Sequence, residues 1–487
     1  MNLIKFTNIF FIVVIISLTP LGFNSYSGSK IYYLLFTTIS TFALLISFNK
    51  NSISFETFFS LLMWLGFWFK FTIQISLLNN MFPEGSGLFD YQPKSYDQIL
   101  LISSVAIIAF ILARYVRLKF IFNYNKLKTT NFNNKQYLSF YSYHRKNIFL
   151  LYLFCIIFFP LINFIFVFFQ KGTIPETYLP FGLNNFVNWL LMFGLSTFSA
   201  ILIFFEFQYK IKNSNKIVKY GLIETFLSSV SILSRAMIFN GTAIIYGFYR
   251  LVEINKIPIN KKSFIKYFLI ILLLFLISLL VVSKLRQSKD FPVGHQVHKY
   301  LPTIEVEITS EHPKTILIAN DLAKEINQVI FLVAGRWVGI EGVMAVQGNK
   351  NLGFDSFFMS FQDKFDYSNS FYENNVKGSK HIYKESPKIF TVYVPGIVAF
   401  LYYTKSIIFL FSSIFILCLF CSILEHYSYK ISKGNIVFSY LIGNVLAYRL
   451  AHFGYLPQNT YKLVFAIAFN ILIVFVIFKL IKMFWKK

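Results

Sequence analysis

The stretch GRWVGIE, residues 335–341, lies inside an apolar run from Val329 to Val346. That run interrupts a polar segment from Lys284 to Val394, whereas nearly all of the remaining chain alternates between long apolar stretches and short basic linkers. Apolar stretches of about 20 residues that recur along a chain are typical of helices that cross a lipid bilayer. The sequence therefore predicts a membrane-embedded frame that holds one large loop, with Arg336 as the foremost candidate for chemistry in that loop.

The composition is that of an all-α polytopic membrane protein. Hydrophobic residues make up 56% of the 487 residues, and aromatic residues make up 20%. Ten candidate membrane spans are predicted at 6–22, 31–48, 55–78, 97–114, 147–169, 186–207, 264–283, 396–424, 435–452 and 462–483. Residues 1–25 also resemble a signal peptide, but the sequence around Pro20 is a poor cleavage site, which favours a first span. The three cysteines all lie in spans, so no disulfide framework is predicted.

The net charge of +25 is carried by linkers beside the apolar spans, which indicates membrane topology rather than nucleic-acid binding. Linker 114–146 has eight basic residues and no acid, and linker 208–219 has four lysines and no acid. Linker 250–266 has five basic residues against Glu253 alone. Because basic linkers tend to face the cytoplasm, all three are expected there.

The region from Tyr220 to Arg250 decides the topology, because the linkers on both sides of it are expected in the cytoplasm. It must then cross outward and return, as two short or broken arms that turn near Ser234 and Arg235. This gives about twelve transmembrane helices, with both termini in the cytoplasm. The alternative is one long tilted helix, which would place linker 250–266 outside and the large loop inside.

Three regions follow from this topology. Residues 1–283 form N-terminal transmembrane helices with basic cytoplasmic linkers, residues 284–394 form a large outer loop, and residues 395–487 form C-terminal transmembrane helices. The loop has thirteen basic and twelve acidic residues, the balance expected of a segment that escapes the cytoplasmic bias. A helix is expected at Leu317–Ala334, within a small ordered subdomain.

Arginine is scarce, with eight arginines against 38 lysines, so a position that uses arginine is informative. Four arginines lie at predicted cytoplasmic ends of spans, and four lie at or beyond the predicted outer face: Arg235, Arg286, Arg336 and Arg449. A guanidinium pairs bidentately with phosphoryl oxygens, so this second group suits a phosphate or pyrophosphate on a lipid. Ordinary ion pairs or snorkelling to the membrane surface would also explain each arginine taken singly.

Glu341, His298 and His452 are the candidate general bases, and a structural polar role is the alternative for each. Glu341 lies five residues after Arg336, about 140° away on a regular helix, so the two are not expected to pair within one helix. Lys70, inside a span, is expected to snorkel. The sequence contains no GxxxxGK[ST], no HExxH and no paired-cysteine metal motif, so neither a metal nor a cofactor is predicted.

Three short stretches resemble the oligosaccharide repeat-unit polymerases of bacterial surface polysaccharide assembly, of the O-antigen polymerase type. They are LSRA at 233–236, GRWVGIE at 335–341 and PGIVAFLY at 395–402. The third match is partial, because that family usually has glycine where Ala399 stands and a Phe-Gly pair where Thr404 and Lys405 stand. The O-antigen ligases have a similar architecture and are the nearest alternative.

The resemblance implies a GT-C-like fold and a metal-independent glycosyltransferase of the bacterial inner membrane. Such an enzyme transfers a growing glycan from undecaprenyl pyrophosphate onto a lipid-linked repeat unit at the periplasmic face, where the large loop would lie. The implied partners are undecaprenyl-pyrophosphate-linked oligosaccharides, the lipid bilayer and a chain-length regulator. A flippase or transporter of lipid-linked oligosaccharide is the competing class, and it would place its charges along a path near mid-membrane.

Overall fold

The computed structural model describes residues 3–78, 80, 82, 86–123, 135–209, 211–257, 261–287, 334–335, 337–363, 370–377 and 393–485. Every regular element in these residues is a helix, and none of them lies in a β-strand. The predicted all-α class is therefore confirmed for the described chain. His298 and nearly all of the helix expected at Leu317–Ala334 lie outside the described residues.

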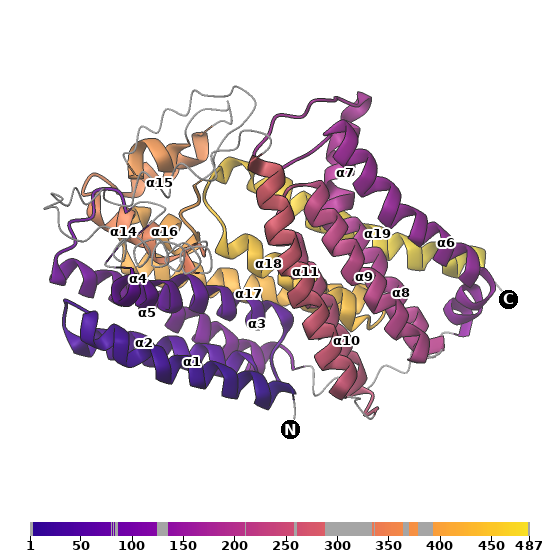
Figure 1. The fold of residues 1–487 in the computed structure, drawn as a ribbon, viewed down its shortest axis with the longest axis horizontal. Coiled ribbons are helices and arrows are strands. Elements are labelled where there is room, and N and C mark those ends of the chain that lie inside the picture. The colour runs from indigo at the N-terminus through magenta and orange to yellow at the C-terminus, as the bar shows by residue number, and fades with distance from the viewer. Residues whose placement is uncertain are drawn as a thin grey trace, which may run out of the picture.

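The first helices form one group, at the left of Figure 1. α1 (Leu3–Ser25) and α2 (Lys30–Ser47) form a hairpin, and the third pass consists of α3 (Ser54–Met63), the π-helix η1 (Trp64–Phe69) and α4 (Lys70–Leu77). α5 (Pro93–Val116) packs against α2 and continues as a short π-helix, η2 (Arg117–Ile121). Pro93 suits the first turn of α5, because a helix makes no internal hydrogen bond from that position.

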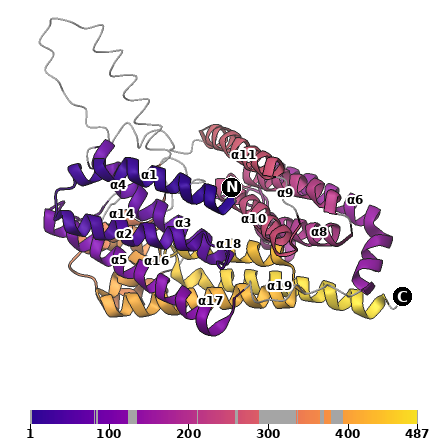
Figure 2. The same cartoon turned by 90° about the horizontal axis from the view of Figure 1, so that it is seen from below.

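The later helices form a second group that is joined to the first through α18 (Ile436–Ala451). In chain order the second group contains α6 (Lys135–Phe166), α7 (Leu183–Trp189), the π-helix η5 (Leu190–Gly194), α8 (Leu195–Tyr209), α9 (Ile211–Ser231), α10 (Ile238–Ile254) and α11 (Lys261–Gln287). α17 (Ile407–Ile431) and α19 (Thr460–Phe484) flank α18 in the chain. α18 packs against α3, α8, α10 and α17, and 14 of its residues are buried, which places it at the centre of the bundle (Figure 2).

Nine described helical segments are long and apolar enough to cross a membrane: Thr7–Ser25, Lys30–Ser47, Ser54–Leu77, Pro93–Ile121, Gln136–Phe166, Pro180–Tyr209, Ile265–Arg286, Ile407–Ile431 and Thr460–Phe484. α18 is apolar but shorter. Large apolar side chains remain exposed on the outer helices, for example Ile31 at 67% and Leu280 at 66%, as expected where a helix contacts lipid. The chain is thus a multi-pass membrane protein, while the full count of twelve crossings stays a prediction.

One predicted span is wrong in its bounds. The stretch 396–424 does not form one helix, because the short helices α16 (Ile397–Leu401) and η9 (Tyr402–Thr404) end at Lys405, whose φ is 55°. α17 starts afresh at Ile407, and Ser406 caps it by accepting a hydrogen bond from Phe409 N at 3.2 Å. The apolar run hid this break, since both sides of it are equally hydrophobic.

α9 and α10 form an antiparallel hairpin, as the charge of the flanking linkers predicted. A Cβ on Gly241 would lie 2.8 Å from Thr225 Oγ1, and a Cβ on Gly221 would lie 3.5 Å from Ile244 Cδ1, so residue numbers rise along one helix as they fall along the other. Leu233 makes the reversal with a φ of 51°. The alternative of a single long helix is therefore wrong, and the linkers before α9 and after α10 lie at the same end of the bundle.

The bundle has two chemically different ends. At one end, Arg117 Nη2 donates to Asn51 O at 3.1 Å and Arg250 Nη2 donates to Lys50 O, so both arginines hold the turn between α2 and α3. The opposite end carries α14 (Ile340–Gly348), α15 (Phe354–Met359) and α16, which Figure 1 shows grouped together and away from both termini. The described parts of the predicted cytoplasmic linkers and of the predicted outer loop thus lie at opposite ends of the bundle.

Candidate functional site

The GRWVGIE stretch enters the helical bundle. A Cβ on Gly66, in the middle of the third span, would lie 2.0 Å from Val338 O, and a Cβ on Gly339 would lie 2.5 Å from Gly66 O. Two backbones approach this closely only where neither residue has a side chain. Ile340, directly after the crossing, is fully buried.

Lys70 and Glu341 form a buried ion pair that fixes this stretch to the third span. Lys70 Nζ lies 2.6 Å from Glu341 Oε2, with side-chain exposures of 0% and 2%, and it also donates to Trp337 O at 2.9 Å. The expectation that Lys70 snorkels to the membrane surface is wrong. A buried ammonium is tolerated here because a carboxylate and a carbonyl replace its hydration. The role of Glu341 as a general base stays a prediction.

The GRWVGIE and PGIVAFLY stretches meet beside the C-terminal end of α18. The ring centroids of Trp337 and Phe239 are 6.3 Å apart, and those of Phe239 and Tyr448 are 5.9 Å apart. Gly396 N donates to Phe453 O at 3.1 Å, just after α18 ends. The two stretches, the start of α10 and the end of α18 therefore converge on one place.

The LSRA stretch reaches the same place through a small cavity. The cavity has a volume of about 20 Å³, enough for one water molecule. Its lining includes Ala236 of this stretch, Phe239 and Asn240 of α10, and Tyr448 and Arg449 of α18. All three stretches that carry the family resemblance thus border one region of the structure.

Cationic side chains from three elements gather at this region. Arg286, at the end of α11, donates from Nη2 to Leu233 O at 2.8 Å and lies 3.4 Å from Lys171 O. Lys171, in the loop after α6, has its amine 6.0 Å from the ring centroid of Tyr448, and both Arg449 and Arg286 act on its charge. Lys171, Arg286 and Arg449 are hereafter called the cationic cluster.

The cationic cluster lacks compensating acids at two of its members. Among the described residues, no carboxylate forms an ion pair with Lys171 or Arg449. Withdrawal from water, reinforced by Arg449 and Arg286, lowers the pKa of Lys171 to about 7. Uncompensated positive charge in a partly buried place is unfavourable until an anion binds. The geometry therefore suits an anionic ligand with several oxygens.

His452 adds a neutral hydrogen-bonding group beside the cluster. Its Nδ1 lies 3.0 Å from Tyr448 O, and a carbonyl can only accept, so Nδ1 carries the proton and the lone pair lies on Nε2. Burial, with Lys171 and Arg449 nearby, lowers the pKa of His452 to about 4. The imidazole is therefore neutral at physiological pH, and its Nε2 can accept a hydrogen bond from a ligand hydroxyl.

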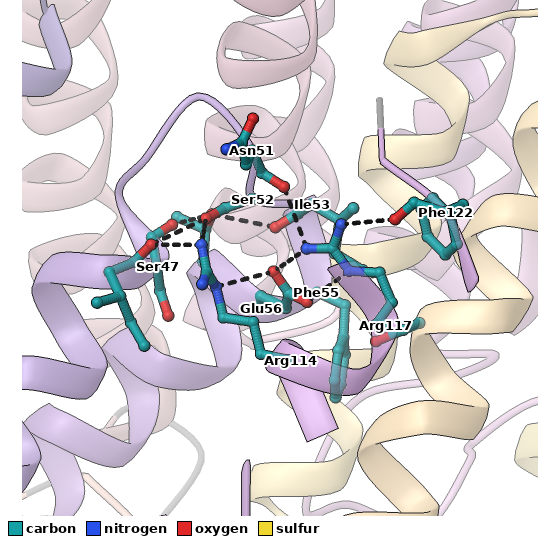
Figure 3. A network of polar contacts seen from close by, with 12 residues as sticks. Ser47, Asn51, Ser52, Ile53, Phe55, Glu56, Arg114, Arg117 and Phe122 are labelled. Atoms are coloured by element: carbon teal, nitrogen blue, oxygen red, sulfur yellow. Dashed lines mark hydrogen bonds and ion pairs between the residues drawn. The ribbon is translucent and has the colours of Figure 1, made fainter. Parts of the chain in front are cut away.

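Arginines at the opposite end of the bundle provide a contrast, because they are paired with acids. Arg117 Nη2 lies 2.6 Å from Glu56 Oε2, and Arg114 Nε lies 3.3 Å from the same oxygen (Figure 3). Arg145 Nε lies 2.6 Å from Glu206 Oε1. Each of these arginines has a carboxylate partner, and the contacts hold helices together. The difference separates structural arginines from the cationic cluster.

The predicted site residues divide into three groups. Arg286, Arg449 and His452 come together, whereas Glu341 is held on Lys70. The backbone of Arg235 lies in the turn that borders the cavity, but its side chain is outside the description, and Arg336 and His298 are outside the described residues altogether. Sequence reasoning missed Lys171, because lysine is the default cation of this chain and nothing in the local sequence marks it.

No protein-family model, no curated protein and no solved structure matches the chain. Among the residues that the structure describes, no group of three or more His, Cys, Asp and Glu side chains is arranged to hold a metal ion. The chemical character of the site therefore follows from its own residues.

Proposed function

We propose that the protein is a membrane glycosyltransferase that polymerises oligosaccharide repeat units, with undecaprenyl pyrophosphate as the leaving group of its donor. The cationic cluster is the observation that carries the proposal. It lies where the three stretches of the family resemblance meet, and Lys171 and Arg449 form no ion pair with an acid among the described residues. The site would face the periplasm of a bacterial inner membrane, with both termini in the cytoplasm. The fold would then be a variant of the GT-C type.

The reaction breaks the bond between the anomeric carbon and a pyrophosphate oxygen, and forms a bond from that carbon to an acceptor hydroxyl oxygen. The electron pair of the broken bond stays on the pyrophosphate, so negative charge grows there, and Arg286 and Arg449 would stabilise it. Arg235 and Arg336 would add to this stabilisation. The acceptor proton would pass to a base, for which Glu341, His298 and His452 are the candidates.

Two other functions share parts of this chemistry. A ligase that transfers finished glycan would use the same pyrophosphate site with a different acceptor. A flippase or transporter would need its charges near mid-membrane, whereas the cationic cluster lies where α11 and α18 end. The position of the cluster therefore favours an enzyme over a transporter.

Deletion of the gene tests the proposal, with the length of the surface glycan as the readout. We expect a glycolipid that carries a single repeat unit, and restoration of the ladder by the unaltered chain. Arg449→Lys should not restore the ladder, because lysine cannot make the bidentate contact of a guanidinium. Loss of one hydrogen bond to a charged group reduces the rate by about 10- to 100-fold. Arg235→Lys and Arg336→Lys should behave alike, and Arg145→Lys, at the opposite end, is the matched control that should restore the ladder.

The outcomes separate the functions. A ladder of normal length in the deletion strain contradicts polymerisation. Loss of all repeats, including the first, indicates a flippase or a ligase instead.

A further inference from the structure

The loop that carries Lys171 is built to hold it in one place. Asn163, at the end of α6, donates from Nδ2 to Phe169 O at 3.0 Å and to Ser231 O at 3.1 Å, and it accepts from Phe169 N at 2.9 Å. Lys171 N then donates to Ile232 O at 3.0 Å. The loop is thereby fixed to the turn between α9 and α10, so the backbone of Lys171 is ordered before any ligand arrives.

The second half of the loop is fixed as well. Asn184, near the start of α7, donates from Nδ2 to Phe168 O at 3.0 Å and to Thr177 O at 2.8 Å, and it accepts from Leu179 N at 2.7 Å. Two asparagines therefore fasten the loop on either side of Lys171. Such a fastening is unnecessary for a lysine that only marks membrane topology.

Among the described residues, the charged groups that act on the Lys171 amine are cationic, and its other titratable neighbours are neutral. Arg449, His452 and Tyr448 lie on or directly after α18, and Arg286 lies on α11. Of these groups, His452 titrates near pH 4 and the guanidinium groups remain charged, so Lys171 alone changes its charge near neutrality, consistent with its pKa of about 7.

We propose that Lys171 is the proton-accepting member of the pyrophosphate site: the empty site holds its amine partly as the neutral form, and binding of the pyrophosphate takes up a proton there. The proposal rests on the proposed function for the nature of the ligand. In the empty site, the two guanidinium groups disfavour the charged form of Lys171. In the occupied site, the negative ligand oxygens favour that charged form. The ligand is therefore bound by three cations, although the empty site holds fewer.

The proton taken up also serves the transfer step. When the glycosidic bond breaks, the leaving pyrophosphate gains one negative charge, and the Lys171 ammonium lies among the groups that face it. The proton remains on the amine throughout, and the acceptor proton goes to the general base, so the charges balance. Lys171 is thus expected to stabilise the leaving group in the charged form only.

The test is binding of a pyrophosphate diester with one short isoprenyl and one methyl substituent to the full chain in nanodiscs, from about pH 6 to about pH 9. This probe has no phosphate group that titrates in the range, unlike a phosphomonoester with a pKa of about 6. The pKa of Lys171 is expected to be lower in the empty site than in the occupied site. The affinity for the probe should therefore be constant below about pH 7 and fall by up to about tenfold per pH unit above it.

Three variants isolate Lys171. Lys171→Arg keeps the charge at all these pH values, so its affinity should be high and independent of pH. Lys171→Gln removes the charge, so its affinity should be low and independent of pH. His452→Gln is the matched control within the site and should keep the pH dependence of the unaltered chain. Calorimetry in buffers of different ionisation enthalpy should show proton uptake only when Lys171 is present.

The outcomes distinguish the inference from the proposed function. Probe binding that depends on Arg449 but shows the same proton uptake in Lys171→Arg overturns the role of Lys171 and leaves the proposed function standing. Absence of binding at every pH, in the unaltered chain and in Lys171→Arg alike, overturns the pyrophosphate site itself and the inference with it.

Discussion

The ion pair between Lys70 and Glu341 fixes the GRWVGIE stretch against the third span. The two partners are far apart in the sequence. The two residues are 271 positions apart, and their charged atoms lie 2.6 Å apart inside the bundle. Neither charge would be stable alone at such depth, so each residue explains the presence of the other. The pair holds GRWVGIE next to Gly66. It thereby places Trp337 against Phe239, which in turn contacts Tyr448 beside the cationic cluster.

A double-mutant cycle tests this coupling. Lys70→Met leaves the Glu341 carboxylate without its ammonium partner, and loss of one member of a buried pair costs about 3–5 kcal/mol. The double variant Lys70→Met/Glu341→Gln should be more stable than the sum of the two single changes predicts. Thermal unfolding in detergent provides the measurement. Strict additivity of the two changes would contradict the coupling.

The sequence predicted some members of the site and missed others for physical reasons. Arg286 and Arg449 were identified because arginine is rare in this chain, so its use is informative. Lys171 was missed because 37 other lysines share its type, and only the folded structure shows that it forms no ion pair with an acid among the described residues. The pairing of Glu341 with Lys70 was equally invisible, since local spacing carries no information about contacts across the bundle.

At the scale of elements, apolar length predicted where helices lie, but it did not predict how they break. The π-helix η1 and the end of η9 at Lys405 both fall within apolar stretches that look continuous in sequence. Backbone geometry, rather than hydrophobicity, distinguishes them. The hairpin of α9 and α10 was predicted correctly because charge on the flanking linkers required it, although neither arm is a typical span.

Gly66 and Gly221 form a matched pair of span glycines that tests the crossing between η1 and the loop. Alanine favours a helix over glycine by about 1 kcal/mol, so Gly221→Ala, whose Cβ would have ordinary contacts at 3.4 Å, should be neutral or stabilising. Gly66→Ala places its Cβ 2.0 Å from Val338 O, so it should lower the unfolding temperature and weaken pyrophosphate binding. Equal effects of the two changes would show that the crossing is not closely packed.

For the whole molecule, acids and bases are distributed unequally between the two ends of the bundle. Glu56 and Glu206 pair with arginines at the end that holds the basic linkers, while Lys171 and Arg449, at the other end, form no ion pair with a carboxylate of the described residues. Paired charges stabilise the frame, and unpaired charges are available to a ligand. The positive-inside tendency predicts an orientation of the frame that places the cationic cluster on the outer side.

Labelling of single cysteines tests that orientation, in a background where Cys155, Cys418 and Cys421 are replaced by alanine. Tyr178 and Asn351 are exposed at the end of the cationic cluster, and Ser142 and Asn255 are exposed at the opposite end. A membrane-impermeant maleimide should label Tyr178→Cys and Asn351→Cys in intact spheroplasts, and should label Ser142→Cys and Asn255→Cys only after lysis. The charge of the basic linkers is the physical reason, because they resist transfer across the membrane. Reversed labelling of all four positions would place the cationic cluster in the cytoplasm, where a periplasmic polymerase cannot act. Different labelling of Tyr178→Cys and Asn351→Cys would contradict the finding that both residues lie at the same end of the bundle.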